Sequence, residues 1–365
     1  MENNQMKFKS QTKQVISDVA GDANLVDALL AYNVAVENLY AAEACTAEAE
    51  TVMDNIASAC ESIKKFGCVP ANMAIFDHNG DLSAALGFKA LSIASLESKS
   101  VSELDSLKGQ YVAGLEGLAR DAWNAFIAGV EKLWKAIVDW FKRILDKNEK
   151  YKQYIEANQS ALQGAELKDQ KVTALTYDQA KQCGDAFKAI SAILANVQST
   201  MPTAIGAAEK GELGNVGEAL FKSIDSQFKT IEKLGIKRTD AGVEVGEFPF
   251  KEEEKTFAEL GYDAGKASAL CKIALGALND QNLKKLAHAI DKAYAEAIKS
   301  AKAAGDDAKK QEIAKNKKAV AAQADKMVKF GNTCLTKLAY SAYVCVKAAK
   351  SPAKPAEGEG EGEKK

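Results

Sequence analysis

The fold is decided by residues 118–147, which read LARDAWNAFIAGVEKLWKAIVDWFKRILDK. Large apolar side chains recur in this stretch at spacings of three and four residues, and charged side chains follow the opposite face. This spacing is typical of one side of an α-helix, and such a helix would be about 45 Å long. The pattern therefore predicts a single amphipathic helix with a candidate interaction stripe formed by Trp123, Ile127, Val130, Trp134, Ile137, Trp140, Phe141 and Ile144.

Two interpretations of this stripe are open. It contains all three tryptophans of the chain, so it contributes a large share of the apolar burial in the fold or in an interface. A stripe this wide normally faces other helices in a bundle core. Alternatively, the helix lies on a membrane or a partner, with flanking lysines beside the tryptophans. Asp139 and Asp146 in the same helix argue against a membrane.

The composition favours long helices throughout the chain. There are 365 residues, enough for two or three domains, and only five prolines. Pro70, Pro202 and Pro249 are the only prolines before the last fifteen residues. Because an interior proline costs a helix ~3 kcal/mol, helices can run nearly unbroken in this chain. We expect a mainly α protein built from elongated helical bundles.

The same patterns predict the individual elements. Residues 82–118 are expected to form short helices, and residues 206–217, with four glycines, a flexible connection. Pro202 is expected to end a helix that begins near Thr176, and Gly305 to divide a helical hairpin. The expected long helices cover residues 11–66, 118–147, 150–165, 176–199, 218–234, 255–304 and 306–350.

One segment has the alternation of a strand. Residues 243–250 alternate apolar and polar side chains after the turn signal at residues 239–242, and Pro249 confines them to a sheet edge or a strand end. We expect one small β-hairpin near residues 236–250 and a disordered acidic tail at the C-terminus. The expected regions are an acidic helical region with a possible propeptide (1–117), a central helical region (118–235), the β element with a Lys/Ala-rich hairpin (236–350), and the tail (351–365).

Charge is distributed unevenly along the chain. The total is −2, but residues 1–117 carry −8 and residues 299–350 carry +8. With 45 lysines and three arginines, any contact with phosphate would be diffuse rather than bidentate. The basic hairpin is either a solvated surface or a non-specific contact for DNA or another anionic partner. The candidate DNA or anion contacts are Lys309, Lys310, Lys315, Lys317 and Lys318.

The sequence contains no pattern of an enzyme. It lacks the common phosphate-binding, nucleophile and metalloprotease motifs, and its two histidines, His78 and His288, are far apart. The seven cysteines form no CxxC pair, so we expect reduced thiols and no metal site. No signal peptide and no apolar segment of membrane-spanning length is found. We therefore expect no catalytic residues, no metal and no cofactor.

The order of segments resembles a known family. An acidic helical region is followed by YVAGLEG at residues 111–117 and by the aromatic helix of residues 123–145. This order is similar to that of the internal head proteins of large tailed bacteriophages, and the similarity covers mainly residues 67–155. The resemblance implies a non-enzymatic virion structural protein of the head interior, present in the host cytoplasm before assembly. Other head proteins and packaged DNA would be its partners.

The resemblance also implies proteolytic processing. In that family, a prohead protease removes a propeptide after a glutamate preceded by small residues or leucine. Two candidate processing sites match this pattern, Glu97 in ASLE and Glu116 in AGLE. Loss of residues 1–116 would change the net charge from −2 to +6, and we hypothesise that this would strengthen contact with DNA.

Two other functions are compatible with the sequence. The first is a soluble helical protein that acts on a membrane or a partner through the Trp-rich helix. The second is a lysine-driven DNA-compaction protein, whose binding would depend steeply on salt and would be indifferent to sequence.

Overall fold

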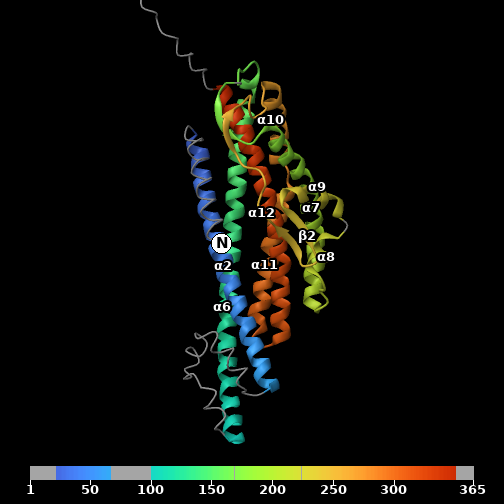
Figure 1. Cartoon of the computed structure of the whole chain (residues 1–365). Coiled ribbons are helices and arrows are strands. Elements are labelled where there is room, and N and C mark those ends of the chain that lie inside the picture. Colours follow the sequence, from blue (N-terminus) through green and yellow to red (C-terminus); the bar gives the residue numbers. More distant parts are fainter. Residues whose placement is uncertain (1–21, 67–99, 168, 223, 351–365) are drawn as a thin grey trace, which may run out of the picture. The chain divides into compact units, whose positions relative to one another are not determined.

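The structure is a computed structural model that describes residues 22–66, 100–167, 169–222 and 224–350 (Figure 1). These residues are mainly helical, so the expected fold class is confirmed. The described residues divide into two compact units: unit 1 contains those within 22–35, 138–293 and 316–350, and unit 2 contains those within 36–66, 100–137 and 294–315. The tail predicted for residues 351–365 lies outside the described residues.

Helix α2 spans Ala23–Phe66, within the helix predicted for residues 11–66. In unit 2 its buried side chains recur with helical spacing and include Leu39, Met53, Ile56 and Ile63. A helix of this length is stabilised mainly by the packing of such a face rather than by intrinsic propensity.

Helix α6, Val101–Asn158, contains the predicted Trp-rich helix and extends it at both ends. The prediction of short helices up to residue 118 is wrong for residues 101–118, which continue α6 without a break (Figure 1). Leu115 is fully buried, and Glu116 forms an ion pair with Lys64 of α2 at 3.3 Å. These contacts offset the cost of the glycines in this stretch, which is about 1 kcal/mol each. The predicted region boundary between residues 117 and 118 falls inside this helix.

Helix α7, Tyr177–Lys210, begins with a capping box in which Thr176 and Gln179 satisfy each other's backbone N–H groups. The prediction that Pro202 ends this helix is wrong, because α7 continues to Lys210. Met201, Ala204 and Ala208 are buried on its second half, and their packing offsets the proline penalty. The helix ends at Gly211, which adopts a left-handed conformation.

The predicted helix over residues 218–234 is wrong, since three short elements replace it. They are α8 (Val216–Phe221), α9 (Asp225–Ile231) and a 3-10 turn, η2 (Glu232–Leu234). Lys222 is extended and breaks the helix. The buried rings of Phe221 and Phe228 then meet edge to face, with 5.5 Å between their centroids.

Two helices replace the one predicted for residues 255–304: α10 (Ala264–Leu278) and α11 (Asn282–Ala304). Asp263 caps α10 by accepting a hydrogen bond from the N–H of Lys266 at 2.7 Å. Gly305, with a φ of +53°, separates α11 from α12 (Ala308–Lys350), which confirms the predicted helical hairpin.

The described residues contain two small antiparallel sheets. Strands β2 (Ile236–Thr239) and β3 (Gly242–Val245) form the predicted hairpin. Strands β1 (Lys171–Ala174) and β4 (Glu253–Thr256) pair as a second sheet that the sequence did not predict. The sheet of β1 and β4 joins segments far apart in the chain, and β4 has no apolar residue in EEKT to mark it as a strand.

The core of unit 1 contains residues from α2, α6, α7, α10 and α12, together with Phe257 and Leu260 from the segment after β4. Tyr151 of α6 and Tyr343 of α12 are buried there, and their rings meet edge to face at 5.8 Å. The 3-10 turn η1 (Gln159–Leu162) follows α6 and contributes Leu162 to this core. The core therefore fixes the end of the Trp-rich helix that lies in unit 1.

Candidate interaction site

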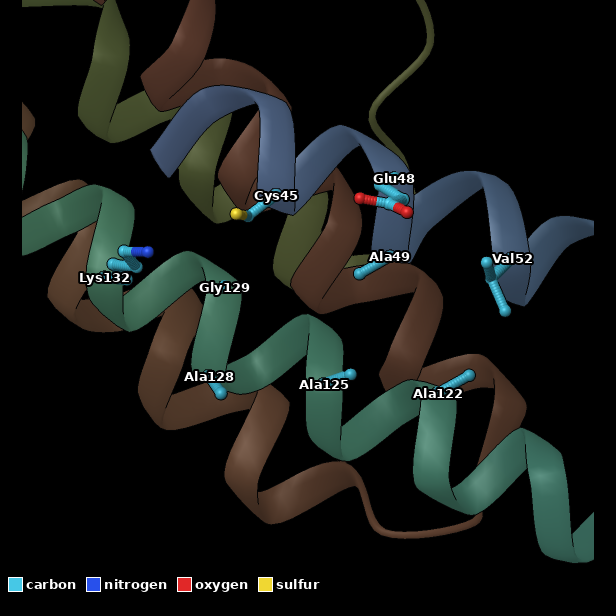
Figure 2. A pocket seen from close by; sticks show the side chains of 9 residues that line it. All are labelled: Cys45, Glu48, Ala49, Val52, Ala122, Ala125, Ala128, Gly129 and Lys132. Carbon is cyan, nitrogen blue, oxygen red and sulfur yellow. The ribbon is translucent and has the colours of Figure 1, made fainter. Parts of the chain in front are cut away.

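An apolar groove of about 460 Å³ lies between α2 and α6 in unit 2. Cys45 and Lys132 lie at one end of it, and Val52 and Ala122 at the other (Figure 2). The groove is lined by four residues of α2 and five of α6: Cys45, Glu48, Ala49 and Val52, and Ala122, Ala125, Ala128, Gly129 and Lys132.

Small residues bring the two helices close together at the floor of the groove. A Cβ added to Gly129 would lie 3.3 Å from the Cα and the Oγ1 of Thr46. Thr46 is buried, and its hydroxyl donates a hydrogen bond to the carbonyl of Ala42 at 2.8 Å, so this polar group is satisfied inside its own helix. The alanines of α6 then leave open apolar surface instead of filling the space.

The chemistry of the groove is that of a binding surface. Its polar members are the carboxylate of Glu48, the ammonium of Lys132 and the exposed thiol of Cys45. Sequence reasoning missed this site, although Cys45, Ala49 and Val52 recur along α2 at helical spacing. The facing residues of α6 come from a segment about 80 residues further along the chain, and no local pattern shows that the two would meet.

The predicted interaction stripe of α6 is mostly buried. Ile127 and Trp134 are half-buried, whereas the other six members are buried: Trp123, Val130, Ile137, Trp140, Phe141 and Ile144. Trp123 stacks on Phe126 with 5.0 Å between ring centroids, and its indole N–H donates to the carbonyl of Ala301 at 3.3 Å. The stripe therefore packs within the chain, as in the first interpretation of the sequence.

Acidic and basic segments that lie far apart in the sequence meet in unit 2. Lys315 of α12 pairs with Asp54 of α2 at 2.8 Å, and Lys302 of α11 pairs with Glu131 of α6 at 2.5 Å. Hydrogen bonding to Lys302 lowers the pKa of Glu131. Arg120 of α6 pairs with Asp306 at 3.3 Å in the turn before α12. Exposed pairs of this kind contribute little singly, about 0–1 kcal/mol. The pairs of Lys315 and Lys302 place acidic side chains on the basic hairpin, whereas Asp306 is an acidic residue of the hairpin turn itself.

The five candidate DNA contacts differ in their surroundings. Lys317 is buried and lies 3.6 Å from Glu209, while Lys315 is paired with Asp54 as described above. Lys309 and Lys310 are exposed in the first turn of α12, where the carboxylate of Asp307 accepts hydrogen bonds from both of their backbone N–H groups. Lys318, the fifth candidate, is half-buried.

The two candidate processing sites also differ. Glu97 lies outside the described residues. Glu116 lies within helix α6. Its side chain is 58% exposed and forms a 3.3 Å ion pair with Lys64. Cleavage after Glu116 would therefore require local unwinding of α6.

Among the described residues, no group of three or more His, Cys, Asp or Glu side chains could hold a metal ion. No helix in the described ranges is both long enough and apolar enough to cross a membrane. Comparison with protein-family models, with curated proteins and with solved structures finds no match to this chain.

Cys45 is expected to react with a maleimide at pH 8 at least 100-fold faster than the buried cysteines of unit 1. Burial raises the pKa of Cys183 and of Cys271 to about 12, so their thiolate fraction falls by roughly 10³ relative to an exposed thiol. Peptide mapping after timed labelling measures each rate. Unfolding in urea should abolish the difference in labelling rate. Rapid labelling of Cys183 in the native protein would contradict its burial in the core of unit 1.

Proposed function

We propose that this chain is a non-enzymatic structural protein of a bacteriophage head, located inside the head with the packaged genome. The proposal starts from the resemblance of residues 67–155 to internal head proteins. The helix that carries most of the resemblance is a core helix of the described residues, and the open apolar groove beside it offers a surface for contact with other head proteins.

The observation that carries the proposal is the pairing of the acidic N-terminal part of the chain with its basic C-terminal hairpin. Asp54 in α2 pairs with Lys315 in α12, and α2 belongs to the region of charge −8. An acidic helix in this position would reduce the attraction of the hairpin for DNA until the contact is released. This arrangement suits a protein that is made in a host cell and packaged later with nucleic acid.

Proteolytic processing belongs to the same proposal. Cleavage after Glu116 would remove all of α2 and the first part of α6, whereas cleavage after Glu97 would leave α6 whole. The two sites therefore have different structural consequences. Release of α2 in either case would free Lys315 from Asp54 and leave the hairpin with its excess positive charge.

The location is tested on purified particles of the virus that encodes the chain. We expect mass spectrometry to find the protein in these particles, and we expect it to resist added protease until the heads are opened by osmotic shock. If the protein is processed, its first peptide begins at Ser98 or Gly117. A major capsid protein serves as the loading control. Absence from the particles, or digestion in intact heads, would contradict the proposal.

A further inference from the structure

A second cavity lies in unit 1, at the turn between α10 and α11. Its volume is about 280 Å³, below the usual range for drug-sized ligands, so it suits a small molecule. Side chains from α6, α7, α10, α11 and α12 line it, together with the turn between α10 and α11, and polar groups form the larger part of its surface. The apolar part of the wall comprises Leu145, Phe187, Ala277, Leu278, Leu283 and Leu335.

A buried polar atom without a hydrogen-bond partner lies at this cavity. Asn148 is only 7% exposed, and its Oδ1 is buried with no hydrogen-bond partner among the described residues. An unsatisfied buried polar group destabilises the folded state, and a ligand that donates a hydrogen bond to it would remove this cost. Because the side-chain amide carries an acceptor and two donors, rotation about its last bond can present either end to the cavity.

The charged groups at the cavity are mainly acidic. Glu149 and Asp280 contribute two carboxylates, and Lys284 contributes one ammonium. The carboxylate of Asp280 is held in place by the Ser191 hydroxyl at 2.5 Å and by the backbone N–H of Asn282 at 2.7 Å. A preorganised carboxylate with a net negative surround favours a cationic ligand over an anionic one.

We propose that this cavity binds a short-chain aliphatic primary ammonium compound. The hydrocarbon chain packs against the leucines and Phe187, and the ammonium donates a hydrogen bond to the carbonyl oxygen of Asn148. Glu149 and Asp280 attract the positive charge.

The test uses the full-length protein at pH 7 and pentylammonium as the probe, with binding followed by NMR titration. Pentylammonium is expected to bind saturably, and pentan-1-ol and pentanoate of the same chain length at least tenfold more weakly. Asn148→Leu and Glu149→Gln should each weaken pentylammonium binding about tenfold. Glu156→Gln, an exposed position on the same helix, should bind like the wild type.

Three results would overturn the proposal. The first is no saturable binding of pentylammonium to the wild type. The second is equal binding of pentan-1-ol, which would mean that the cavity binds the alkyl chain and that the ammonium group adds no affinity. The third is full affinity in both variants. If Asn148→Leu does not fold, the exposed position Glu149 decides alone, because its substitution leaves the core intact.

Discussion

Lys147 is expected to contribute a rise of about 2 kcal/mol to the free energy of unfolding of unit 1 between pH 6 and pH 8.5, and Lys147→Met is expected to lose this contribution. Lys147 of α6 is fully buried. Its Nζ donates to Thr336 Oγ1 at 2.6 Å and to Asn332 Oδ1 at 3.3 Å, and lies 4.0 Å from the centre of the Tyr32 ring. No carboxylate of the described residues forms an ion pair with it.

The sign of the effect follows from the direction of the pKa shift. Burial lowers the pKa of Lys147 from 10.5 to about 7. Between pH 7 and the unfolded value, the unfolded chain therefore binds more protons than the folded chain, and stability rises with pH. Below about pH 6 both states are protonated and this contribution is constant. Above about pH 8 the raised pKa of Cys183 and of the other buried cysteines acts in the opposite direction, in the wild type and in the variant alike. The difference between the two proteins therefore isolates the contribution of Lys147.

Methionine has a similar unbranched shape and no charge, so Lys147→Met removes the cost of a buried cation. It also leaves Asn332 and Thr336 without this donor, which costs about 1–3 kcal/mol. Lowering the pKa from 10.5 to about 7 corresponds to about 5 kcal/mol, so the net expectation at pH 6 is a variant more stable by about 2–4 kcal/mol that lacks the contribution of Lys147 to the pH dependence. Urea unfolding followed by circular dichroism at several pH values measures this.

Lys142→Met is the matched control, because Lys142 is exposed on the same helix. It should keep the pH dependence of the wild type. The same pH dependence of stability in the wild type and in Lys147→Met would show that Lys147 is not a neutral buried amine near pH 8.

Part of this site could be predicted from the sequence. Trp140, Ile144, Lys147, Tyr151 and Ile155 recur at spacings of four and three residues, so helical periodicity places Lys147 on the buried face of α6. Its polar partners could not be predicted in this way. Asn332 and Thr336 lie on α12, more than 180 residues away, and only tertiary packing brings them to the amine.

The same distinction holds for the fold. Local signals predicted the long helices and the β2–β3 hairpin, where the pattern and the turn lie within one short segment. Contacts between segments far apart in the sequence determine the features that local signals do not predict. Buried Met201 and Ala204 carry α7 past Pro202, and the pairing of β1 with β4 depends on chain segments about 80 residues apart. The groove likewise depends on the close approach of Gly129 to Thr46.

A chain that begins at Gly117 is expected to lose the fold of unit 2. The truncation removes α2, whose buried side chains in this unit include Val36, Leu39, Met53, Ile56 and Ile63. At about 1.5–3 kcal/mol for each side chain, the loss is roughly 10 kcal/mol. Since folded proteins are stable by only about 5–15 kcal/mol, the remaining helices should not hold together. Circular dichroism should show reduced helicity, and amide hydrogen exchange should show loss of protection over residues 117–137 and 294–315.

The matched control is the full-length protein cut once by a site-specific protease between residues 67 and 99, because it has a broken chain but retains α2. This nicked protein should keep the helicity and the melting temperature of the intact chain. If the truncated chain also keeps them, α2 is dispensable, and the change in net charge from −2 to +6 would be the main consequence of cleavage after Glu116. If only the truncated chain unfolds, cleavage after Glu97 is compatible with a folded packaged protein as long as α2 stays bound. Cleavage after Glu116 would then unfold unit 2 and also remove the acidic partner of Lys315, because α2 provides both the buried face and Asp54.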